Sequence, residues 1–196
     1  MKLFLDKEEL ILSDFEDCIP TVLLAVAFSS VEVVRYMLKD PRVTLKYHYH
    51  FMKSVSCQSL LNQACAFGRP DMVDLLFSLY SDVELGAYDV NDCGFTCLTY
   101  AVNRGMIPVI WALRKQSNVY PKLLDVSLKQ KFAVTEDLVF TDAIVQAGQV
   151  NAMREIIRDF QSDESLKKIM IFIVSRSKNH FHELFSCAFT QRAHLT

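Results

Sequence analysis

Apolar residues recur at helical spacing in pairs of short segments along this chain. Two of the second segments carry a proline near their start, Pro70 or Pro108, where the first turn of a helix accepts it. The pattern predicts helices near 20–28 and 31–39, 59–67 and 70–80, and 96–104 and 107–116, then a fourth copy over 139–160 and a closing pair near 165–177 and 180–189. We therefore expect a helical chain with short connections.

The links between these pairs differ in pattern. Residues 43–51 alternate aromatic and polar side chains, which predicts an extended finger. Residues 117–137 form a long link, with one extra helical turn expected around 120–126. At the N-terminus, residues 6–12 predict a short helix capped by Asp6, which would cover the first apolar face. No shift in composition marks a second domain.

One segment, 92–105, carries a specific motif. Gly94, Thr96 and Ala101 belong to a Gly-x-Thr-x-Leu-x-x-Ala run, and Gly105 follows four residues after the alanine. The segment resembles the ankyrin repeat, whose consensus is Gly-x-Thr-Pro-Leu-His-x-Ala-Ala-x-x-Gly with a period of about 33 residues.

The register of this motif recurs along the chain. The turn between the two helices of each copy falls at Ser29, Gly68, Gly105, Gly148 and Asn179, at intervals of 39, 37, 43 and 31 residues. Glycine and asparagine tolerate the left-handed turn that such a position uses. The small buried residue of the family is matched by Ala25, Ala64 and Ala101, and by Ser175 in the last copy.

The resemblance implies an all-α fold, an ankyrin-type helical solenoid of about five helix-turn-helix repeats with terminal capping helices. The expected divisions of a single domain, 1–196, are a cap at 1–15 and repeats near 16–50, 51–90, 91–134, 135–163 and 164–190. No copy keeps the Thr-Pro-Leu-His tetrad, since Thr96 is the only threonine at its place and Cys97 replaces the proline. Stability is therefore expected to rest on packing more than on regular loop hydrogen bonds.

The resemblance also implies a role in binding a partner protein. Ankyrin proteins usually grip partners with finger tips and with exposed positions of the first helix in each repeat. Carried over by register, the expected protein-binding residues are Phe28, Gln58, Phe67, Phe95, Asn103, Arg104 and Gln146. The alternative is that irregular fingers fold over the aromatic rings and bury them. The degenerate repeats also resemble ankyrin proteins of intracellular bacteria and large DNA viruses, which implies an effector acting on a host protein.

Composition narrows the classes of protein to which this chain can belong. The chain has 196 residues, of which 51% are hydrophobic and 22% charged, as expected of a folded protein. The net charge of −2 comes from interleaved acids and bases, so nucleic-acid binding is not expected. No apolar run approaches the roughly 18 residues that a membrane span requires, and the N-terminus has acids where a signal peptide needs its apolar core. A cytoplasmic monomer is expected.

The sequence gives little support for catalysis or for a metal. The six cysteines are interpreted as reduced small hydrophobic residues. His48 and His50 share one side of a predicted strand, but further ligands are not evident. His180 and Cys187 share a helix face, yet two turns separate them, which is too far for proton transfer. We expect no enzyme activity, cofactor or metal; an ankyrin-supported Cys/His enzyme and a regulatory fragment that docks on a catalytic domain remain the alternatives.

Overall fold

A computed structural model describes residues 20–51, 54–90, 95–129 and 150–159, together with residues 190 and 193. Within these residues the chain is mostly helical and contains one two-stranded sheet. The helices are α2 (Thr21–Phe28), α3 (Val31–Met37), α4 (Leu60–Ala66), α5 (Pro70–Leu79), α6 (Cys97–Asn103), α7 (Ile107–Arg114), α8 (Tyr120–Lys129) and α10 (Val150–Ile157), and the strands are β1 (Lys46–Phe51) and β2 (Ser54–Ser59). The mostly helical prediction is confirmed, while the predicted cap at 1–15 and the closing pair at 165–177 and 180–189 lie outside the described residues.

Side-chain caps start three of the helices. The hydroxyl oxygens of Ser30, Ser59 and Thr96 each accept a hydrogen bond from the backbone N–H three residues further on, at the starts of α3, α4 and α6. Such caps satisfy one of the free N–H groups of a first helical turn. Pro70 and Pro108 lie in the first turns of α5 and α7, as the sequence predicts.

Glycines turn the chain between the helices of the second and third pairs. Gly68 and Gly105 have positive φ angles of 67° and 68°, which confirms the predicted left-handed turns at these two positions. A Cβ atom on Gly68 would also lie 2.8 Å from the sulfur of Met106. Ser29 differs, since its backbone is extended with φ of −97° and ψ of 174°.

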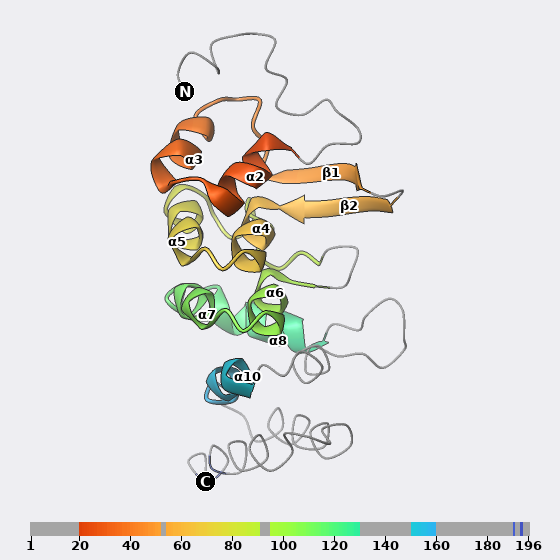
Figure 1. Ribbon diagram of the computed structural model, residues 1–196. Helices are drawn as coiled ribbons and strands as arrows, with labels where there is room; N and C mark the ends of the chain where they lie inside the picture. The colour runs from red at the N-terminus through yellow and green to blue at the C-terminus, as the bar shows by residue number, and fades with distance from the viewer. Residues whose placement is uncertain are drawn as a thin grey trace.

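The helix pairs stack in two rows (Figure 1). In one row α4 packs between α2 and α6, and in the other α5 packs between α3 and α7. The helices of each pair, α2 with α3, α4 with α5 and α6 with α7, also contact each other. Each helix of the middle pair therefore has neighbours on three sides.

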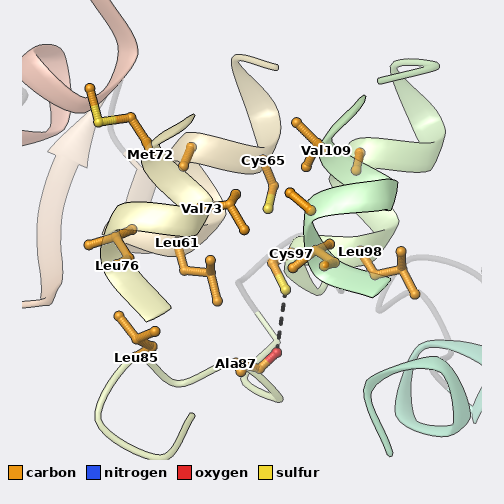
Figure 2. Packing of buried hydrophobic residues seen from close by; sticks show 14 of the residues in the cluster. Leu61, Cys65, Met72, Val73, Leu76, Leu85, Ala87, Cys97, Leu98 and Val109 are labelled. Carbon is orange, nitrogen blue, oxygen red and sulfur yellow. Dashed lines mark hydrogen bonds between the residues drawn. The ribbon is translucent and has the colours of Figure 1, made fainter. Parts of the chain in front are cut away.

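Small side chains are buried on the inner helices α4 and α6. Ala64 and Cys65 of α4 and Cys97 and Ala101 of α6 are completely buried. Figure 2 shows the two cysteines in the packed region between the second and third pairs, where the thiol of Cys97 donates to the carbonyl oxygen of Ala87 at 3.5 Å. Because these side chains are short, the backbones of α4 and α6 can approach closely while larger side chains fill the space around them.

The first finger is a β-hairpin that extends away from the helices (Figure 1). β1 pairs antiparallel with β2, with Lys46 opposite Ser59, so the extended finger predicted over 43–51 is confirmed. The hairpin adds a small sheet to a fold that was expected to be all-α. The Lys46 ammonium pairs with the Asp89 carboxylate at 2.5 Å, which ties the hairpin to the next loop.

α8 corrects the prediction of a single helical turn in the link after α7. It is a helix of ten residues because one of its faces is buried against the stack: Leu123 is fully buried and Ser127 also lies inside. The hydroxyl of Ser127 lies 2.7 Å from that of Thr96, the cap of α6. This contact joins residues far apart in the chain, so local pattern alone did not reveal the helix length.

A polar cluster holds α10 against α7 and α8. Arg114 donates to the Asp159 carboxylate at 2.7 Å and to the backbone oxygen of Glu155 at 3.1 Å. The phenol of Tyr120 donates to the same Asp159 oxygen at 2.5 Å, and burial raises the pKa of that phenol. The indole of Trp111 donates to the Glu155 carboxylate at 3.2 Å. Partial burial acts to raise the pKa of Glu155, but the hydrogen bonds from Trp111 and Arg114 and the positive charges of Arg158 and Arg114 together outweigh it and hold that pKa below its usual value.

Replacing Ala101 with leucine should overpack the contact between α6 and its neighbours, because the site has no exposed surface. We expect a loss of about 1–3 kcal/mol in the free energy of unfolding, measured by urea titration. Ala101→Ser, which keeps the residue small, should lose less. A leucine variant as stable as the parent would contradict the packing described here.

Acid should loosen the attachment of α10. The pKa of Glu155 is lowered in the folded state, so its contribution to stability is present above its ordinary pKa and is lost as the pH falls through the lowered value. Trp111, the only tryptophan of the chain, reports the change through its fluorescence. We expect a step in Trp111 emission as the pH falls below the ordinary pKa of a glutamate, and Glu155→Gln should remove this step. Asp74→Asn, which breaks the exposed Lys115–Asp74 pair between α7 and α5, is the control and should retain the step; a step of equal size in Glu155→Gln would refute the assignment.

Candidate functional site

Two exposed aromatic rings meet at the ends of neighbouring inner helices. Phe28 is the last residue of α2 and is 71% exposed, while Phe67 follows α4 directly and is 39% exposed. Their ring centres lie 5.1 Å apart with an interplanar angle of 78°. This edge-to-face arrangement is favourable for two rings, yet it leaves Phe28 largely in water. Exposed apolar side chains that adjoin one another are more informative than single ones, because contiguous apolar patches mark interaction sites.

Arg104 continues this arrangement onto the next inner helix. It follows α6 directly, and its guanidinium carbon lies 5.8 Å from the centre of the Phe67 ring. Its Nη1 group donates to the backbone oxygen of Ala66 at 2.9 Å, which fixes the guanidinium at the end of α4. We call Phe28, Phe67 and Arg104 the aromatic–arginine row. Each member comes from the end of a different helix in one stack.

A second arginine holds the α2 end of the row in place. Arg69 donates to the backbone oxygens of Ala27 and Ser29 at 3.1 and 2.8 Å, and these two residues flank Phe28. It also pairs with the Asp71 carboxylate at 2.7 Å, and this hydrogen bond raises the pKa of Arg69. Carbonyl groups at a helix end lack partners within the helix, so Arg69 supplies them. Phe28 is exposed on a backbone that is anchored on both sides.

The row is widened by residues one turn earlier on the same helix faces. Leu24 precedes Phe28 by four positions and is 41% exposed. Tyr100 precedes Arg104 by four positions, and its ring centre lies 5.2 Å from that of Phe95. Residues four apart share one face of a helix. The apolar surface therefore extends beyond the row on both α2 and α6.

The predicted site residues divide into those the structure brings together and those it does not describe. Phe28, Phe67 and Arg104 lie next to each other, and Phe95 lies beside Tyr100, half-buried. Gln58 lies on β2 and Asn103 ends α6, but their side chains are outside the described residues, as is all of Gln146. The alternative in which the fingers bury the rings does not hold for Phe28 or Phe67.

Three contributors were missed by the sequence analysis. The same register could have identified Leu24 and Tyr100 as site residues, because each stands one helical turn before a predicted residue. Arg69 follows the turn glycine, outside the positions that the sequence analysis considered for binding, and its contacts with α2 depend on how neighbouring pairs stack.

The cysteines that the structure describes do not form a reactive site. Cys65 and Cys97 are free thiols with no exposed surface. Burial raises the pKa of the Cys65 thiol, and the neighbouring Cys97 adds to this effect. The thiolate is the nucleophilic form, so the shift disfavours reactivity. The pair His180 and Cys187 lies outside the described residues.

The described part of the chain also lacks two other kinds of feature. Over residues 20–51, 54–90, 95–129 and 150–159 the structure contains no group of three or more His, Cys, Asp or Glu side chains arranged to hold a metal ion. Within the same ranges no helix combines the length and apolar character of a membrane span.

Comparison with known proteins does not identify this chain. No protein-family model, no curated protein and no solved structure matches it.

The buried thiols should be protected from alkylation. Iodoacetamide is expected to label Cys65 and Cys97 slowly in native buffer and rapidly in urea, since neither thiol has exposed surface and each must become exposed before the reagent can reach it. Peptide mass spectrometry over a time course measures both rates. Equal rates in the two buffers, at either cysteine, would show an accessible thiol and contradict the buried position described here.

Proposed function

We propose that this chain is an ankyrin-type helical solenoid that binds a partner protein without catalysis. The observation that carries the proposal is the aromatic–arginine row, in which two exposed rings and an exposed guanidinium from three successive inner helices lie in contact. We place the partner on this row and on the adjoining Leu24 and Tyr100.

The repeat part of the proposal is supported by residues that occupy the same position in two helix pairs and are buried in both. Ser59 caps α4 and Thr96 caps α6, and each cap stands the same number of residues before the turn glycine of its pair, Gly68 or Gly105. The same count pairs buried Leu61 with Leu98 and buried Ala64 with Ala101. Two copies that share their cap, core and turn positions are what a repeat requires.

The chemistry of the surface supports a protein partner. Aromatic residues and arginine are enriched at the centres of protein interfaces, where truncating a single one often costs more than 1 kcal/mol. Arg104 is already held by its bond to Ala66, and Arg69 anchors the backbone beside Phe28, so binding would order little further backbone or arginine side chain. A nucleic-acid surface would need several unpaired cations, whereas Arg69 is neutralised by Asp71.

Three broader expectations of the sequence analysis stay predictions. They are a cytoplasmic location, a monomeric state, and an effector role toward a host protein. The proposal depends on none of them, because it concerns only the surface and the class of molecule that covers it.

The test compares truncations of exposed apolar residues in and outside the row. Phe28→Ala and Phe67→Ala should each weaken capture of a partner from cell lysate by about tenfold, equivalent to roughly 1.4 kcal/mol. Val83→Ala is the matched control, since Val83 is 74% exposed in the turn after α5 and should leave capture unchanged. Circular dichroism checks that each variant is folded. Capture that survives both phenylalanine truncations, or that falls equally in the Val83 variant, would remove the row from the binding site.

A further inference from the structure

We propose that the partner segment contains an Asp or Glu side chain that binds Arg104, with apolar residues on both sides of it in the partner chain. This inference rests on the proposed function and specifies the chemistry of the partner.

Arg104 has N–H donors that make no hydrogen bond to a described residue. An arginine side chain carries five N–H donors, and the contact with Ala66 uses one of them. Four other described arginines, Arg42, Arg69, Arg114 and Arg158, each pair with a carboxylate at 2.6 to 3.3 Å. Among the described residues no carboxylate pairs with Arg104, although its side chain is exposed. The surface therefore carries a positive charge that no described residue of the chain neutralises.

The guanidinium of Arg104 is also held in position. It lies against the Phe67 ring at 5.8 Å and is tied to the end of α4 by the hydrogen bond to Ala66. A fixed, planar guanidinium matches the two oxygens of a carboxylate, which it can bind through two parallel hydrogen bonds. Because the side chain is already ordered, less conformational entropy is lost when a carboxylate arrives.

The apolar neighbours indicate an internal acidic residue in place of a chain terminus. Phe67 and Phe28 extend the surface from Arg104 toward α2, while Tyr100 and Phe95 extend it along α6. A bound segment covers both sides only if it continues in both directions from the carboxylate. A terminal carboxylate would leave one side uncovered.

A phosphorylated partner fits less well. Phosphate recognition in proteins commonly uses a cluster of arginines. The arginine anchored at the α2 end of the row, Arg69, is occupied by Asp71 and by backbone oxygens of α2 and Ser29. One unpaired guanidinium beside aromatic rings suits a single carboxylate with apolar neighbours.

The test is a selection from a random twelve-residue peptide library displayed on phage, carried out on the full chain and on three variants. The parent protein should enrich peptides with an Asp or Glu flanked by apolar residues. Arg104→Gln should lose the acidic enrichment and keep the apolar one, and Arg104→Lys should weaken it. Phe28→Ala should keep the acidic enrichment and lose apolar preference. Circular dichroism confirms folding of each variant.

One enriched peptide is then synthesised and its affinity measured by fluorescence anisotropy. Changing its acid to the amide should weaken binding to the parent about tenfold and leave binding to Arg104→Gln unchanged. Amidation of the peptide C-terminus and addition of inorganic phosphate should have no effect. Loss of binding on amidation, or displacement by phosphate, would assign Arg104 to a chain terminus or to a phosphate group and overturn the inference.

The selection separates two failures. Enriched peptides that are sensitive to Phe28→Ala but show no preference for acids would overturn the inference and leave the proposed binding surface standing. Enrichment of no peptide sensitive to Phe28→Ala would contradict the proposed function itself.

Discussion

Close packing of α4 between α2 and α6 is the constraint on which the rest of this structure depends. Cys65 of α4 and Cys97 of α6 lie next to each other and are fully buried, and Ala64 and Ala101 are buried on the same helices; all four side chains are short, so these helices can lie close together. Their C-terminal ends then come side by side, which places a residue from each end within reach of the next. The aromatic–arginine row is a consequence of this packing, and larger residues in the contact would separate its members.

The sequence was sufficient to place the first three helix pairs, with ends within two residues of those observed. The reason is that helix caps, turn glycines and small buried residues recur in one register, as at Gly68 and Gly105. The length of α8 was not predictable in the same way. Its buried face is defined by contact with α6, including the bond between Ser127 and Thr96, and such contacts between distant residues leave little local signal.

The candidate site was predictable as a set of positions but not as an arrangement. Register alone identified Phe28, Phe67 and Arg104 as residues at the ends of inner helices. Helix rotation and side-chain rotamers decide the angle of 78° between the two rings and the position of the guanidinium against one of them. The support from Arg69 was also hidden, because its hydrogen bonds reach carbonyl groups of the preceding pair.

The contact between Phe28 and Phe67 depends on the stacking of the helices and forms part of the exposed row. It can be measured directly. In a sample labelled with carbon-13 at phenylalanine, nuclear Overhauser spectroscopy should show a cross-peak between the protons of these two rings, whose centres lie 5.1 Å apart. Phe28→Leu should abolish the peak and identify it. A folded parent protein without this cross-peak would contradict the account, since its inner helices would not end side by side and the row would not exist as one surface.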